Sequence, residues 1–206
     1  MTTRQLLNIL LTVTFLCFCD AVHAGIITFS DSDLASSNPV TISGVTLTTS
    51  TGGGSIAFWN SGAPWTGLWL GDDHSSGSYT LGFSQPINSI EIEFDALSNT
   101  GPTAAEQLFN FANSNGAVSI AYTNQGGTLF DGTVITSTAD NGEGIISFAG
   151  PAFNSFSFDH GQGEQTGFIV ERLVINAVPE PSTLAALAGL LGMGMIGYGW
   201  RRRRKR

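Results

Sequence analysis

The segment INSIEIEFD, residues 87–95, decides the fold class because apolar and acidic side chains alternate along it. Ile90, Ile92 and Phe94 occupy every second position, and a carboxylate follows each of them. A period of two residues is the spacing of side chains that point to one face of a β-strand. The segment therefore predicts a strand with one buried face and one acidic face.

Short apolar segments of the same kind recur from residue 25 to residue 177, and turn-forming pairs such as Asn141-Gly142 separate them. The other candidate strands span residues 25–30, 40–47, 55–60, 67–71, 78–84, 108–112, 117–123, 134–137, 144–148, 155–159 and 168–177. About eleven short strands in one domain are typical of an antiparallel β-sandwich, and their number favours the jelly-roll form. The first and last of these strands are expected to lie close together.

The same stretch, residues 25–177, is strongly acidic. It contains fourteen Asp and Glu residues and a single basic residue, Arg172. Such a charge repels nucleic acids and anionic lipids, whereas divalent cations and neutral polysaccharides remain suitable partners. Both cysteines, Cys17 and Cys19, precede this stretch, so the domain is expected to have no disulfide.

The N-terminal segment, residues 1–24, has the order of parts found in a secretory signal peptide. Arg4 is followed by the apolar run of residues 6–18, and small residues stand at Val22 and Ala24. We expect cleavage between Ala24 and Gly25, which places the domain that follows outside the cytoplasm.

The C-terminal segment, residues 178–206, has three parts. Val178-Pro179-Glu180-Pro181 is expected to be extended and exposed, because proline disfavours helix in the residue before it and donates no backbone hydrogen bond. Residues 184–200 carry no charge and would form a helix about 26 Å long, close to the thickness of a bilayer core. A positive cluster, expected to stay in the cytoplasm, then follows: Arg201, Arg202, Arg203, Arg204, Lys205 and Arg206.

This order of motif, apolar helix and basic end resembles the PEP-CTERM sorting signal of Gram-negative bacteria. Pro179, Glu180 and Pro181 match the motif that gives the signal its name. The resemblance implies recognition by exosortase, a membrane protease, after which the protein leaves the inner membrane for the cell surface. It also implies a role linked to exopolysaccharide or biofilm. Together with the signal peptide, the sorting signal divides the chain into residues 1–24, 25–177 and 178–206.

Acidic residues provide two candidate cation sites within the domain. Asp72 and Asp73 lie in a glycine-bounded loop and offer the oxygen ligands that Ca²⁺ prefers, although turn chemistry is the favoured explanation for them. Glu91, Glu93 and Asp95 share one strand face, which is either a solvated surface or a cation-binding ladder.

Trp59, Trp65 and Trp69 fall close together and offer rings that can stack on sugars, or side chains that can fill a core. Catalytic signatures are missing from the sequence, since it has neither a G-x-S-x-G nor an H-E-x-x-H motif, and His74 and His160 lack metal-ligand spacing. We therefore expect no enzyme. A structural or adhesive surface protein is favoured, and the alternatives are a Ca²⁺-assisted carbohydrate-binding module and a glycan-active enzyme.

Overall fold

The structure, a computed structural model, describes residues 25–60, 65–71, 76–99, 105–161 and 167–178. These residues belong to one compact unit, Ala24–Val178. They form thirteen strands and one short helix, with the following bounds: β1 Gly25–Phe29, α2 Asp31–Leu34, β2 Val40–Ile42, β3 Val45–Gly52, β4 Ile56–Asn60, β5 Thr66–Leu70, β6 Gly77–Leu97, β7 Gln107–Asn113, β8 Gly116–Ala117, β9 Ala121–Gly126, β10 Thr128–Phe130, β11 Ile135–Ser137, β12 Gly142–Gly161 and β13 Phe168–Ala177.

All the strand pairs are antiparallel and join in one open sheet, whose main path runs β10-β11-β7-β12-β6-β13-β5-β4. The prediction of an all-β antiparallel domain is confirmed. The predicted pair of sheets in a jelly-roll-like sandwich is replaced by a single continuous sheet. The reason lies in two long strands, β6 and β12.

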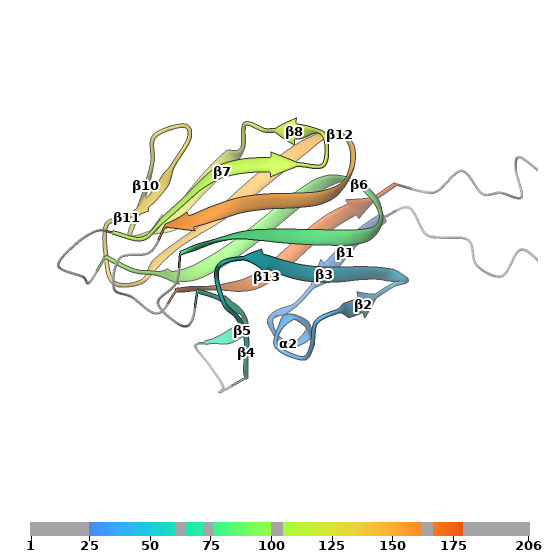
Figure 1. Ribbon diagram of the computed structural model, residues 1–206, viewed down its shortest axis with the longest axis horizontal. Helices are drawn as coiled ribbons and strands as arrows, with labels where there is room; N and C mark the ends of the chain where they lie inside the picture. Colours follow the sequence, from blue (N-terminus) through green and yellow to red (C-terminus); the bar gives the residue numbers. More distant parts are fainter. Residues whose placement is uncertain (1–24, 61–64, 72–75, 100–104, 162–166, 179–206) are drawn as a thin grey trace, which may run out of the picture. The chain divides into compact units, whose positions relative to one another are not determined.

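Strands β6 and β12 are 21 and 20 residues long and pair with each other along their whole length. The sequence predicted each of them as two short strands. Pro86 and Pro151 stand at the expected breaks, but the chain stays in β-conformation and only the register shifts there. Both strands turn back on themselves midway, so that their two halves lie in separate layers (Figure 1).

One hydrophobic core fills the space between these layers. Ile90, Ile92 and Phe94 from the second half of β6 are buried, as the alternation in residues 87–95 predicted. Tyr79 and Phe158, from the other halves of β6 and β12, belong to the same core. Residues far apart along each long strand therefore stabilise the fold together, each large side chain by roughly 1.5–3 kcal/mol.

The two ends of the domain are paired with each other. Strand β1 lies beside β13, with Gly25 opposite Ala177 and Ile27 opposite Ile175, which confirms the predicted neighbourhood of the first and last strands. The backbone N–H of Val178 donates to the carbonyl of Pro86 at 2.9 Å. Hydrogen bonding within the sheet therefore continues to the last residue before Pro179.

No helix among the described residues is long and apolar enough to cross a membrane. The predicted signal peptide, residues 1–24, and the predicted membrane helix, residues 184–200, lie outside the described residues.

Candidate functional site

The outward side of β6, β12 and β13 carries the acidic ladder expected from residues 87–95, and we call it the acidic face. Arg172 on β13 is the counter-ion of this ladder: its Nε donates to Glu93 Oε2 at 2.5 Å and its Nη2 donates to Glu91 Oε1 at 3.1 Å. Burial alone would raise the pKa of Glu93, but hydrogen bonds from Arg172 and Gln125 outweigh it and hold the pKa below its usual range. The domain's single basic residue is thus held by two carboxylates.

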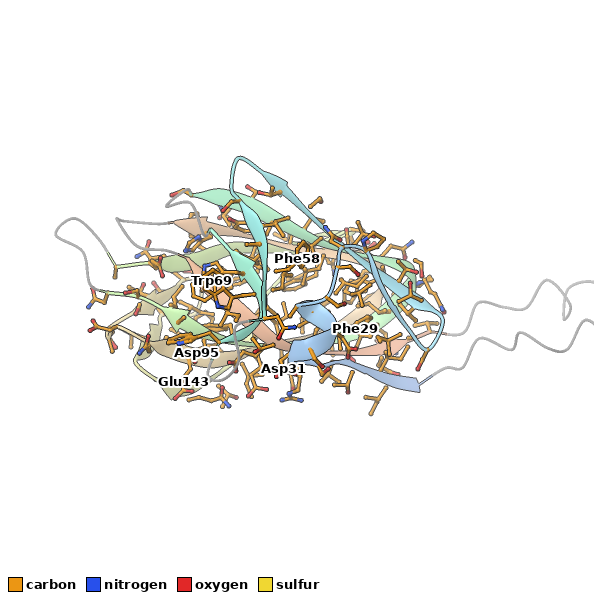
Figure 2. All side chains as sticks on the ribbon, turned by 90° about the horizontal axis from the view of Figure 1, so that it is seen from below. Phe29, Asp31, Phe58, Trp69, Asp95 and Glu143 are labelled. Carbon is orange, nitrogen blue, oxygen red and sulfur yellow. The ribbon has the colours of Figure 1, made fainter. Side chains whose placement is uncertain are left out.

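Glu171 lies beside this ion pair at an irregularity of β13, between the pairs Val170–Phe94 and Arg172–Glu93. Partial burial, and then the negative charges of nearby carboxylates, raise the pKa of Glu171 to about 7. These carboxylates include Asp31, Asp95 and Glu143, which are labelled in Figure 2. At neutral pH, Glu171 therefore carries a proton for part of the time.

The three tryptophans lie at the end of the acidic face near Asp95: Trp59 is on β4, Trp69 is on β5, and Trp65 immediately precedes β5. The ring centroid of Trp69 is 5.6 Å from that of Trp59 and 6.2 Å from that of Trp65. Trp69 is only 8% exposed, because with Ile169 and Ala96 it forms a second small core against which Trp65 packs. Of the two roles that the sequence left open, filling a core applies to Trp69, whereas the ring of Trp59 is 40% exposed.

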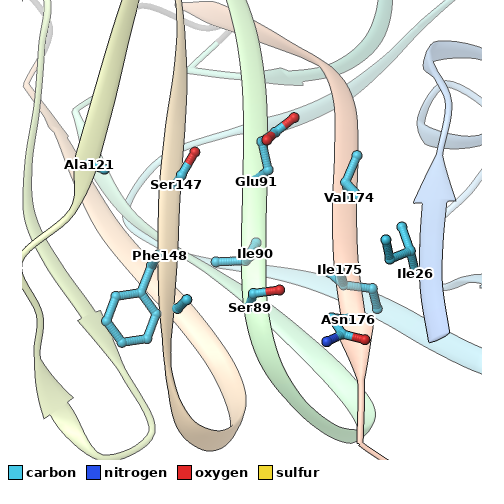
Figure 3. Close-up of a pocket in the computed structure, with 11 residues that line it drawn as sticks. Ile26, Ser89, Ile90, Glu91, Ala121, Ser147, Phe148, Val174, Ile175 and Asn176 are labelled. Carbon is cyan, nitrogen blue, oxygen red and sulfur yellow. The ribbon is translucent and has the colours of Figure 1, made fainter. Parts of the chain in front are cut away.

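A groove of about 320 Å³ crosses the other end of the acidic face (Figure 3). Its floor runs over β13, β6, β12 and β9, where short side chains at Ser89, Ser147 and Ala121 leave room. Ile26 on β1 stands at its edge and is 78% exposed. Sequence reasoning did not find this groove, because its residues come from five strands and meet only through their register.

Two buried ionisable side chains lie inside the fold, and no sequence pattern indicates either of them. Glu106 accepts the backbone N–H of Ser98 at 2.6 Å and that of Gly167 at 3.1 Å. The Nε2 of His160 is 3.9 Å from Glu106 Oε1, and both side chains are fully buried. Burial lowers the pKa of His160 to about 4, so its imidazole is neutral at physiological pH.

Asp159 and His160 are neighbours on β12, but their side chains lie on opposite sides of the strand. The carboxylate of Asp159 accepts hydrogen bonds from Ser78 at 2.5 Å and from Asn110 at 2.7 Å on the outside of β12. His160 points to the opposite, buried side of the same strand, as alternation requires.

Other predicted site residues are not covered by the structure. Asp72 and Asp73, the candidate Ca²⁺ ligands, lie outside the described residues, and so do Ala24 and the motif Pro179-Glu180-Pro181. Within the described part of the chain, no three His, Cys, Asp or Glu side chains are grouped so that they could hold a metal ion.

The family model of the PEP-CTERM protein-sorting motif matches residues 177–204. The chain carries a PEP-CTERM sorting motif. This motif implies export, a membrane-anchored precursor and processing by exosortase. The match begins at Ala177, the last residue of β13. Neither a curated protein nor a solved structure matches the chain.

Proposed function

We propose that the chain is delivered by exosortase to the cell surface or extracellular matrix, where its β-domain has a structural or adhesive role associated with exopolysaccharide or biofilm. The family match at residues 177–204 is the observation that carries the sorting part of this proposal. The precursor would span the inner membrane once through residues 184–200, with the basic residues 201–206 in the cytoplasm.

The boundaries of the fold support processing at both ends. Gly25, the first residue after the expected signal cleavage, pairs with Ala177, the last residue of β13. The hydrogen bond from Val178 to Pro86 ends the paired region one residue before Pro179. A cut beyond Val178 would therefore remove no residue that the described sheet uses.

A non-catalytic role is part of the proposal. Glu106 and His160 have the chemistry of an acid–base pair, but both side chains are fully buried and out of reach of a substrate. On the acidic face, Arg172 binds the carboxylates of Glu91 and Glu93, which suits a stable surface. An acidic β-domain of this kind fits a matrix component better than an enzyme.

The sorting role can be tested by substitution in a host that has exosortase. Glu180→Ala is expected to leave a full-size precursor in the membrane fraction, whereas the control Thr183→Ala, just beyond the motif, is expected to be processed normally. Replacing residues 201–206 by glutamine should have the same effect as Glu180→Ala, and replacing them by lysine should not, because lysine keeps the positive charge. The proposal is wrong if the Glu180→Ala protein reaches the surface at the size of the processed wild type.

A further inference from the structure

The groove on the acidic face has the dimensions of a binding site. Its volume of about 320 Å³ falls within the ~300–1,000 Å³ usual for ligand sites. It crosses five neighbouring strands, in the order β1, β13, β6, β12 and β9, as Figure 3 shows. Strands lie about 4.8 Å apart, so the groove is roughly 19 Å long. A site of this length accommodates a segment of a polymer.

The lining of the groove combines hydrogen-bonding groups with aliphatic surface. Ser89 and Ser147 provide hydroxyls, Asn176 provides an amide, and these groups both donate and accept hydrogen bonds. Ile26 and Val174 provide apolar surface on the same side of the sheet. Sugars present hydroxyls at their edges and C–H groups on their faces, and this lining matches both.

The charges around the groove select a neutral ligand. Glu91 lines the groove, and its carboxylate is engaged by Arg172 at 3.1 Å. Arg172 is also bound to Glu93, and it is the one Lys or Arg residue from 25 to 177, so no free Lys or Arg side chain of this stretch is available to a polyanion. Fourteen acidic residues in the same stretch repel anionic polymers further.

The backbone around the groove argues against a peptide ligand. Extended peptides bind by adding a strand to an open sheet edge, where main-chain groups are unpaired. The groove instead lies over the face of β13, β6 and β12, each of which has a hydrogen-bonded strand on both sides. Recognition at this place must therefore come from side chains.

We propose that the groove lined by Ile26, Ser89, Ser147, Val174 and Asn176 binds a segment of a neutral polysaccharide. The site differs from the tryptophan cluster suggested by the sequence. It extends the role proposed for the domain at the cell surface, but its test requires neither exosortase nor delivery to the surface. Failure of sorting and failure of binding are therefore distinguishable.

The test is affinity gel electrophoresis of the full chain, made in a host without exosortase and purified in non-ionic detergent. The probes are barley β-glucan, xyloglucan, galactomannan and dextran, each cast separately into a native gel. We expect at least one of them to retard the protein. Ser147→Arg, which fills the groove, should weaken this binding at least tenfold, and Asn176→Ala, which adds no bulk, should weaken it measurably.

Ser157→Arg provides the matched control. Ser147 and Ser157 both lie on β12 at partly exposed positions, each between β6 and a strand that presents an alanine, Ala121 in one case and Ala112 in the other. Ser157 does not line the groove, so Ser157→Arg should bind as the wild type does. The proposal is overturned if none of the four polysaccharides retards the protein, or if Ser147→Arg binds as tightly as Ser157→Arg. It is also overturned if binding depends on Trp59 alone, as Trp59→Ala would reveal.

Discussion

Acidification should destabilise the β-domain through His160, the one histidine among the described residues. Its ring packs against Phe168, with centroids 5.1 Å apart, and against Tyr79, at 6.4 Å. Glu106 is the carboxylate that faces it, but at 3.9 Å the two side chains are too far apart for a hydrogen bond. Burial therefore dominates and lowers the pKa of His160 from 6.5 to about 4.

The direction of the effect follows from proton linkage. The unfolded chain takes up a proton at His160 near pH 6.5, whereas the folded chain does so only near pH 4. The stability due to the neutral imidazole is thus fully present above pH 6.5 and is lost as the pH falls toward 4. At about 1.4 kcal/mol per pKa unit, the loss amounts to about 3 kcal/mol.

Urea unfolding of the wild type and of His160→Phe, measured at intervals from pH 7.5 to pH 4, isolates this contribution. Phenylalanine fills the same space but does not titrate, and the carboxylates titrate in both proteins. The free energy of unfolding of the wild type, relative to the variant, should fall by about 2–3 kcal/mol between pH 7 and pH 4. A difference that stays constant with pH would refute the reasoning.

Two further substitutions test other ionisable groups. The pKa of folded Glu171 is raised from 4.5 to about 7, so the stability of the wild type relative to Glu171→Gln should be fully present below pH 4.5 and should fall as the pH rises through 7. Solvent screening limits this change to about 1 kcal/mol. Thermal midpoints of both proteins at pH 5 and pH 8 measure it. Each carboxylate oxygen of Glu106 accepts one backbone N–H, from Ser98 or from Gly167. In Glu106→Gln an amide nitrogen, which cannot accept, replaces one of these oxygens, so the free energy of unfolding should fall by about 1–3 kcal/mol. The exposed control Glu143→Gln should change it little, and equal urea midpoints for these two glutamine variants would contradict the assigned role of Glu106.

Local patterns predicted the parts of the fold that depend on local chemistry. Alternation placed Ile90, Ile92 and Phe94 in the core, because strand geometry fixes which side chains share a face. The two strands predicted at residues 78–84 and 87–95 are one strand, β6, although Pro86 lies between them. Proline removes one donor from the ladder, yet pairing between β6 and β12 resumes after the register shift.

The candidate sites depended on contacts between distant residues, and the sequence predicted them less well. The groove needs the register that sets Ser147 beside Glu91 and Ala121, and nothing near Ser147 in the sequence indicates it. Glu106 belongs to no pattern, and its buried position results from backbone donors at Ser98 and Gly167 that the fold brings to it. The sorting motif, in contrast, is a contiguous sequence signal and was found directly.

Intact mass spectrometry of the protein recovered from the cell surface tests the central claim most directly. In a host with exosortase, the chain is expected to begin at Gly25, to retain the whole β-domain through Val178 and to lack the apolar and basic residues 184–206. In the same host without exosortase, the expected product keeps Arg206 and stays in the membrane fraction. A surface-located chain that still ends at Arg206 when exosortase is present would contradict the account.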